Sequence, residues 1–365
     1  MKSYTVGEYR QAIDALAPFS LTQSWDNTGI LIGSPARRVE RALVALDATA
    51  PIIAEAAEVG AQLIVAHHPI IFQGLKYIPE HSPAYRAIRA DIAVICAHTN
   101  LDIAAGGVND VLAALLDLRD TEVIETTQTS PYRKVVVYVP TENAQAVYAA
   151  MAEAGAGQQG NYAGCAFFSK GQGCFTPLHG ASPAIGKVGR PESVDEVRLE
   201  MLAAPDDIPA VLRALKSAHP YQEPAFDIFE TGWGAVRQGI GRTGSLPQPF
   251  TPAGLAAYVK QKLEPSALRY IPGTGEITRV AVCGGAGGSF IEQALAVGAQ
   301  ALITGEAKYS QLLEAREMGL TLIESGHYAT EAVVLPGLVH KLKAALPGAD
   351  IRRASACDDP GQILC

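Results

Sequence analysis

Three short segments of the chain place histidines and carboxylates just after runs of apolar residues. The polar residues concerned are His67 and His68, His98 and Asp102, and His327 and Glu331. A mixed set of imidazole and carboxylate ligands suits zinc, iron or manganese rather than calcium. The residue types therefore predict a divalent-metal site, provided that the fold brings the three segments together.

The spacing within the segments favours two ions over one. Adjacent histidines on a turn, such as His67 and His68, cannot easily bind one ion through the same face, but each can bind one of two neighbouring ions. His327 and Glu331 are four residues apart, so they share one face at the start of a helix. Paired ions need a bridging ligand, usually a carboxylate, and Glu331 is our candidate for it.

Each feature also has a purely structural interpretation. A histidine after a strand is commonly a hydrogen-bonded structural residue, and an acid such as Glu331 is favourable in the first turn of any helix. The metal-site interpretation rests on three such segments occurring at equivalent strand ends.

The elements around these residues predict an α/β core. Residues 41–116 alternate strand and helix, and the same alternation returns over residues 279–345. The apolar runs are continuous, which is typical of parallel strands covered on both faces. Ligands of open parallel sheets bind beyond the carboxyl ends of the strands, so we expect the three segments to meet at one rim.

The two α/β regions look like copies of each other. With a shift of 238 residues, the tripeptide Gly-Ala-Gln at 60–62 aligns with the one at 298–300, and with a shift of 229, HTNLD (98–102) aligns with HYATE (327–331). Part of this agreement is expected of any two βαβ units, because they share a hydrophobic pattern. We interpret the rest as a duplicated parallel-sheet core in two halves.

A region with a different pattern of strands and helices separates the two halves. Residues 132–235 read as strand, helix, Gly-rich hairpin, strand, helix and strand, which is typical of a small α+β sandwich with an open sheet. We therefore expect core half one at 1–131, an inserted α+β domain at 132–235 and core half two at 236–365.

Composition narrows the class of protein. The net charge of -8 argues against a nucleic-acid partner, because nucleic-acid surfaces are normally basic. Neither a signal-peptide pattern nor an apolar stretch of membrane-spanning length is present in the sequence. The six cysteines are scattered without a CxxC motif. We expect a reduced, cytoplasmic protein without a membrane partner.

Six blocks of the sequence resemble the NGG-one-interacting-factor-three-like family, also described as dinuclear metal centre hexameric proteins or GTP cyclohydrolase 1 type 2 homologs. The blocks are WDNTGILIG (25–33), AHHPIIF (66–72), AHTNLD (97–102), CGGAGGS (283–289), ITGEAKY (303–309) and SGHYATE (325–331). The inserted region resembles the PII/CutA-like, ferredoxin-like domain of the long bacterial members.

The resemblance implies two divalent ions per chain, a toroidal homohexamer built as a trimer of dimers, and metal ligands that coincide with our set. These ligands are His67, His68, Asp102, His327 and Glu331. His98 becomes a neighbour of the site, and we expect Glu306 and Tyr309 near it as well. Glu306 and Ser310 replace the aspartate and histidine that are common in the family.

Three classes of function fit these expectations. The first is a metal-dependent hydrolase that acts on a nucleotide-like or phosphoester substrate through a metal-bridging water. GTP cyclohydrolase activity is a narrower version, for which the sequence reveals no base-binding pocket. The second is a non-catalytic regulatory or metal-handling hexamer, in which the inserted domain binds a small effector. The third is a scaffold whose metals hold the fold, so that chelation would unfold it.

Overall fold

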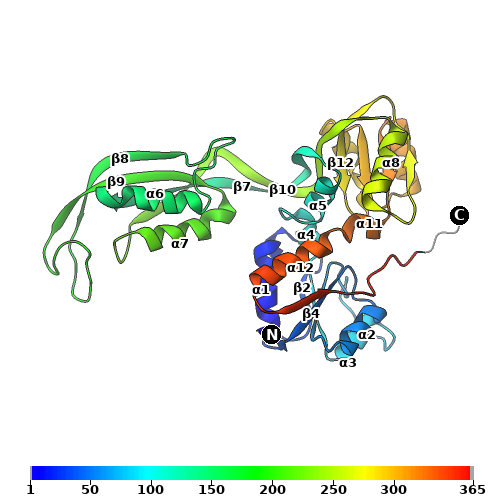
Figure 1. The fold of residues 1–365 in the computed structure, drawn as a ribbon, viewed down its shortest axis with the longest axis horizontal. Coiled ribbons are helices and arrows are strands. Elements are labelled where there is room, and N and C mark those ends of the chain that lie inside the picture. Colours follow the sequence, from blue (N-terminus) through cyan, green and yellow to red (C-terminus); the bar gives the residue numbers. More distant parts are fainter. Residues whose placement is uncertain (1, 362–365) are drawn as a thin grey trace. The chain divides into compact units, whose positions relative to one another are not determined.

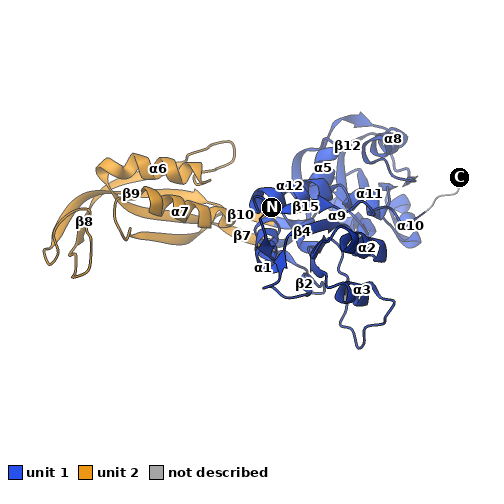
Figure 2. Cartoon of the chain, turned by 60° about the horizontal axis from the view of Figure 1, so that its bottom comes forward, with its two compact units in different colours: residues 1–128, 238–365 blue, residues 129–237 orange. Residues whose placement is uncertain are grey.

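The computed structural model describes residues 2–361, which form two compact units (Figure 2). The core unit comprises residues 1–128 and 238–365, and the inserted unit comprises residues 129–237. Five cysteines of the described residues carry free thiols, and Cys365 lies outside the described residues. None of the described helices is long and apolar enough to cross a membrane.

The first half of the core unit contains a five-stranded sheet in the order β15-β4-β5-β6-β2. β4 (Arg41–Ala45), β5 (Leu63–Ala66) and β6 (Ala93–Cys96) run parallel, as their continuous apolar sequences predict. β2 (Gly29–Ile32) pairs antiparallel with β6, and β15 (Asp350–Arg353) pairs parallel with β4.

The second half repeats this arrangement around three parallel strands, β12 (Ile277–Cys283), β13 (Ala301–Thr304) and β14 (Thr321–Glu324). β11 (Arg269–Ile271) pairs antiparallel with β14, and the end of β10 (Phe226–Phe250) pairs antiparallel with β12. The α/β class is therefore as expected, but both sheets are mixed because antiparallel strands flank their parallel centres.

Equivalent positions of the two halves make the same hydrogen bonds. Oε1 of Gln62 accepts the backbone N–H of Arg41 at 3.1 Å, and Oε1 of Gln300 accepts that of Arg279 at 2.8 Å. Each arginine side chain in turn donates to the carbonyl oxygen three residues before its glutamine. The Gly-Ala-Gln repeat thus marks the same set of hydrogen bonds in both halves, which supports the interpretation of the halves as copies.

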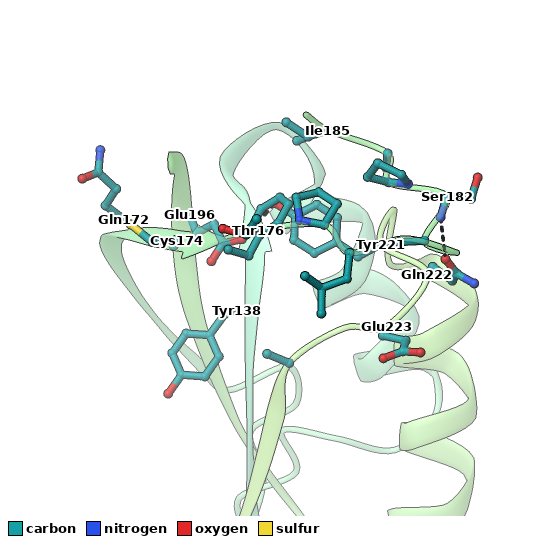
Figure 3. Close-up of a pocket in the computed structure, with 18 of the residues that line it drawn as sticks. Tyr138, Gln172, Cys174, Thr176, Ser182, Ile185, Glu196, Tyr221, Gln222 and Glu223 are labelled. Atoms are coloured by element: carbon teal, nitrogen blue, oxygen red, sulfur yellow. Dashed lines mark hydrogen bonds between the residues drawn. The ribbon is translucent and has the colours of Figure 1, made fainter. Parts of the chain in front are cut away.

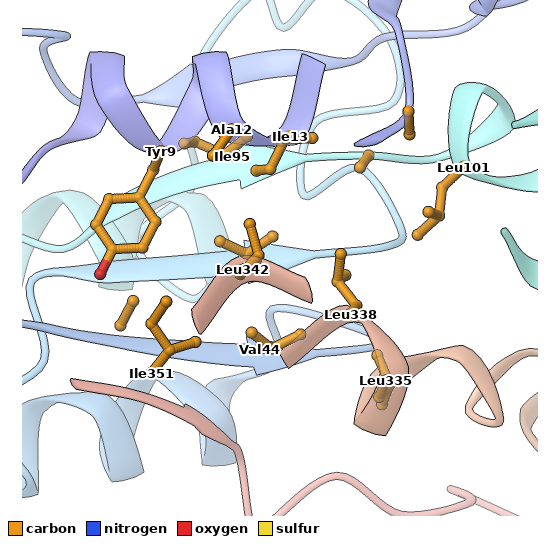
Figure 4. Packing of buried hydrophobic residues seen from close by; sticks show 14 of the residues in the cluster. Tyr9, Ala12, Ile13, Val44, Ile95, Leu101, Leu335, Leu338, Leu342 and Ile351 are labelled. Atoms are coloured by element: carbon orange, nitrogen blue, oxygen red, sulfur yellow. The ribbon is translucent and has the colours of Figure 1, made fainter. Parts of the chain in front are cut away.

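The two halves exchange a helix. α5 (Val108–Leu115) follows the first sheet, but its Leu112 packs in the apolar core of the second sheet. α12 (Val334–Ala345) follows the second sheet, but its leucines pack in the first core, around Val44 of β4 and Ile351 of β15 (Figure 4). The structure therefore differs from our assignment of residues 236–365 to the second half alone.

The remaining core helices cover the sheets or link them (Figure 1). They are α1 (Val6–Leu16), α2 (Ala50–Glu58), α3 (Pro83–Arg89), α8 (Pro252–Leu263), α9 (Ile291–Ala296) and α10 (Tyr309–Glu317). α3 and α8 begin alike, because the hydroxyl of Ser82 or Thr251 accepts a backbone N–H and a proline follows. Two short helices, α4 (Thr99–Ile103) and α11 (His327–Glu331), follow β6 and β14 closely.

The inserted unit has the element order that the sequence predicts. Its elements are β7 (Arg119–Pro140), α6 (Ala144–Glu153), β8 (Ala166–Phe175), β9 (Glu192–Ala203), α7 (Ile208–Ala218) and β10. The strands lie in the order β10-β7-β9-β8, and β9 pairs antiparallel with both β7 and β8, which is the split β-α-β topology. Residues of α6 and α7 share an apolar core with alternate residues of β7 and β9, so the helices cover one face of the sheet.

Candidate metal centre

The three segments meet at the carboxyl ends of the parallel strands of the core unit. His67 and His68 follow β5, Asp102 lies in α4, and His327 and Glu331 lie in α11. Two groups of donor atoms, each within 4.8 Å, contain Glu331: His67, Asp102 and Glu331, and His68, His327 and Glu331; a third group joins His67 and His68 to His98. The structure thus brings all five predicted residues together, and Glu331 belongs to both of the first two groups.

Three imidazoles converge on one carboxylate oxygen. Oε2 of Glu331 lies 2.8 Å from Nε2 of His68, 3.1 Å from Nε2 of His327 and 3.7 Å from Nε2 of His67. Nε2 of His67 also lies 3.5 Å from Oδ1 of Asp102. The ring nitrogen of each histidine that faces the centre is therefore Nε2.

The other ring nitrogen of each histidine is bonded outward. Nδ1 meets the carbonyl oxygen of Ala97 at 2.8 Å for His67, Asp47 at 2.8 Å for His68 and Glu306 at 3.3 Å for His327. A carbonyl oxygen only accepts, so Nδ1 of His67 carries a proton, which turns the free lone pair of Nε2 inward in the neutral ring. Such outer partners orient histidines that bind metals.

The buried Nε2 of His67 tests whether a metal would fit. This atom has no hydrogen-bond partner among the described residues. An unsatisfied buried polar atom costs about 1–3 kcal/mol, and a bound ligand would offset this cost. An ion between His67, Asp102 and Glu331 would provide it, and the donor set fits zinc, iron or manganese.

The close packing of these groups shifts their pKa values. Burial opposes protonation of His68, but Asp47 and Glu331 outweigh it and raise the pKa of His68 to about 10. Burial raises the pKa of Asp102 to about 6. Burial also opposes ionisation of Glu331, but His327 and His67 hold the pKa of Glu331 well below its usual range. The cluster without metal therefore retains protons that a divalent ion would displace.

A glycine makes room for the shared carboxylate. Gly285, in the Gly-rich turn after β12, has a φ of +63°, and a Cβ added to it would lie 2.1 Å from Oε1 of Glu331. The same Cβ would lie 3.1 Å from Nε2 of His327. The turn therefore has to carry a glycine at this position so that α11 can approach it.

His98 adjoins the cluster, and its donor atom lies within 4.8 Å of those of His67 and His68. Its ring centroid is 5.3 Å from that of His67 and 5.6 Å from that of His68. Nδ1 of His98 is 2.8 Å from Oδ1 of Asp26, whose buried carboxylate also accepts from Thr99. Burial opposes ionisation of Asp26, but these contacts lower its pKa to about 2.

The cluster opens into a cavity of about 750 Å³. Trp25 and Phe72 line this cavity with 58% and 47% of their surface exposed, and their ring centroids are 6.0 Å apart. Gln293 also lines it: Nε2 donates to Glu125 at 3.1 Å, while Oε1 is buried without a partner among the described residues. The cavity therefore offers aromatic faces and an unsatisfied acceptor beside the cluster.

Sequence reasoning missed Asp47, Asp26 and Gln293. Asp47 follows β4 as the histidines follow β5, so the same strand-end rule could have found it. Asp26 and Gln293 carry no comparable signal, because one lies in a loop and the other near the start of a short helix. Tyr309 is 75% exposed at the start of α10 and is not among the described residues that line the cavity.

Comparison with known proteins agrees with this fold. Two relatives, each called GTP cyclohydrolase 1 type 2 homolog, come from Bacillus subtilis (40% identical over 346 residues, 93% of this chain and 92% of the relative) and Halalkalibacterium halodurans (39% over 342 residues, 92% and 91%). The crystal structure of a Bacillus cereus protein related to NIF3 matches with a TM-score of 0.84 and 34% identity, over 100% of both chains. The family described as Duf34/NIF3 (NGG1p interacting factor 3) matches residues 4–359, so the resemblance is confirmed and the chain belongs to this family.

Proposed function

We propose that this protein binds two divalent metal ions per chain and uses them to hydrolyse a nucleotide-like or phosphoester substrate. The observation that carries the proposal is the sharing of Glu331 between two groups of donors. His67 and Asp102 would hold one ion, His68 and His327 would hold the other, and Glu331 would bridge them. Zinc, iron and manganese all suit this set.

The ions and the protein have separate tasks in this proposal. When bound, paired divalent ions polarise the substrate and lower the pKa of a water between them. The protein orients the histidines through Asp47 and the carbonyl oxygen of Ala97, and it keeps Glu331 ionised.

The cavity supports a substrate with a planar ring. Exposed rings such as Trp25 and Phe72 provide stacking surfaces that any nucleobase can use. Oε1 of Gln293 could accept an N–H of such a base, which would satisfy an otherwise unpaired atom. GTP cyclohydrolase activity, the activity in the relatives' name, is a narrower form of this proposal.

The assembly and location belong to the proposal as well. We place the protein in the cytoplasm as a homohexamer, a trimer of dimers, with the inserted unit as a PII/CutA-like module. The split β-α-β topology supports the assignment of the inserted unit, and the resemblance to the family implies the hexamer. A regulatory or metal-handling role is the second candidate, and it is favoured by a large cavity in the inserted unit.

Metal content and turnover, measured on the same sample purified without chelator, test both candidates. About two ions per chain with metal-dependent turnover of nucleotides or phosphoesters would support the hydrolase. The same metal content without turnover on the whole panel would favour the regulatory role. Absence of bound metal would contradict both.

A further inference from the structure

The inserted unit contains a cavity of about 880 Å³ that the metal chemistry does not use (Figure 3). Its walls are the end of β8, the loop at residues 176–185, the start of β9 and the segment at residues 221–225. This volume is typical of sites for small molecules.

One buried charge lines this cavity. Glu196 of β9 is only 8% exposed, and Oε1 of its carboxylate accepts the hydroxyl proton of Tyr221 at 3.0 Å. Tyr221 is the only hydrogen-bond partner of this carboxylate among the described residues. No described cationic residue forms an ion pair with the carboxylate. Oε2 of this carboxylate has no hydrogen-bond partner among the described residues, so it is available to a positively charged or N–H donor group of a ligand.

The carboxylate is held in a prepared position. A Cβ added to Gly173 of β8 would lie 2.1 Å from Oε2 of Glu196, so the glycine leaves the space that this oxygen uses. The backbone N–H of Tyr221 donates to Nδ1 of His219 at 3.0 Å, and Nε2 of His219 donates to the carbonyl oxygen of Tyr138 at 2.9 Å. Tyr221 and Glu196 are thus oriented before any ligand arrives.

The rest of the wall combines apolar side chains, uncharged polar side chains and exposed charges. The Tyr221 ring packs against Phe175, with centroids 5.6 Å apart, and Leu178 of the loop is 73% exposed where a ligand could cover it. The cationic residues of the wall are exposed, and Arg198 is already paired with Glu200 at 3.2 Å. The wall therefore suits a cation with an apolar body better than it suits an anion.

We propose that this cavity binds a small organic amine, whose ammonium group pairs with Glu196 and whose apolar part lies against Tyr221 and the 176–185 loop. The backbone N–H of Ser182 donates to Oε1 of Gln222 at 3.2 Å, which ties this loop to the opposite wall (Figure 3). The site lies within the inserted unit and does not depend on the metal cluster.

Three probes of similar shape test the proposal on the full-length chain by ligand-detected NMR titration. They are phenethylamine, the neutral 2-phenylethanol and the anionic 3-phenylpropionate. We expect the amine to bind at least about tenfold more tightly than the alcohol, because a charge-assisted hydrogen bond forms only with the amine. Equal binding of amine and alcohol, preference for the acid, or no binding of the amine would overturn the proposal.

Substitutions of Glu196 and Tyr221 test whether the amine binds in this cavity, and two further variants serve as controls. Glu196→Gln should remove the preference for the amine, whereas Glu153→Gln, an exposed glutamate of α6, should retain it. Tyr221→Phe should weaken binding of the amine, because the carboxylate loses the hydroxyl that orients it. Unchanged amine binding in Glu196→Gln would contradict the assignment. Glu331→Ala should bind the amine as the wild type does, which separates this site from the metal centre.

Discussion

Nε2 of His68 lies 2.8 Å from Oε2 of Glu331, although the two residues follow strands of different sheets. This contact joins the two halves of the core unit at the candidate metal centre. Glu331 belongs to both donor groups that include a carboxylate and His68 to only one of them, so the two residues should contribute unequally to metal binding.

We expect Glu331→Ala to lose most of both ions and His68→Ala to lose about one of the two, with the fold intact in each case. Metal analysis by mass spectrometry and far-UV circular dichroism would measure this. Glu317→Ala, at an exposed position of α10, is the matched control. Full metal retention in both site variants would refute the assignment of the ligands.

Asp47 should strengthen metal binding by orienting the ring of His68. Asp47→Asn should weaken metal binding by about 10–100-fold, because the partner that orients the His68 ring loses its charge. Competition with a chromophoric chelator would measure the affinity. Asp91→Asn, which changes an exposed aspartate paired with Arg37, should have no effect on metal binding. A wild-type affinity in Asp47→Asn would show that the contact does not position the ligand.

Metal affinity should rise with pH. Without metal, His68 has a pKa of about 10 and Asp102 a pKa of about 6. His68 is therefore protonated at neutral pH, and Asp102 becomes protonated as the pH falls below about 6. An ion binds the deprotonated ligands, so binding releases protons and strengthens as pH rises from about 5 to 8. Calorimetry at one pH in buffers of different ionisation enthalpy would detect this release. A binding heat independent of the buffer would contradict it.

Removal of the metal should leave the fold in place. Each sheet of the core unit packs between two apolar clusters, and none of these four clusters includes the donor residues. We expect a chelator to preserve the far-UV circular dichroism and to lower the melting temperature. The loss of stabilisation would be about 2.7 kcal/mol if the free metal had been at one hundred times its dissociation constant. Loss of secondary structure on chelation would instead indicate a metal scaffold.

Trp25 should recognise a base. The chain has two tryptophans, so Trp233→Phe leaves Trp25 as the single tryptophan reporter. In that background GMP should quench the fluorescence of Trp25, and ribose 5-phosphate should bind more weakly by about 5–150-fold, because stacking of one base contributes about 1–3 kcal/mol. Calorimetry should show that Trp25→Ala weakens GMP binding and that Trp25→Phe restores most of it. Equal affinity for both ligands would argue against stacking.

The clustering of the candidate ligand residues was predictable because a parallel sheet gathers the ends of its strands, and each candidate segment follows a strand of continuous apolar sequence. His67 and His68 after β5, and Glu331 after β14, illustrate this rule. Asp26 could not be found in the same way, because its role depends on a loop that reaches His98 from 72 residues away.

The exchange of α5 and α12 between the two halves could not be predicted from the sequence either. The buried leucines of α12 form an apolar stripe, and such a stripe does not specify which of the two sheets it covers. The pairing of β15 with β4 follows from the sheet that α12 covers, because α12 delivers the C-terminal strand to the first sheet.

The exchange of α5 and α12 has a consequence for the ancestry of the fold. A half-length chain with this pattern would leave its own sheet without the covering helix, and it would complete its core only by trading that helix with a second copy. Such a trade is domain swapping in a symmetric dimer. The present polypeptide contains both exchanged helices, α5 and α12, so it has the architecture of a domain-swapped dimer fused into a single chain.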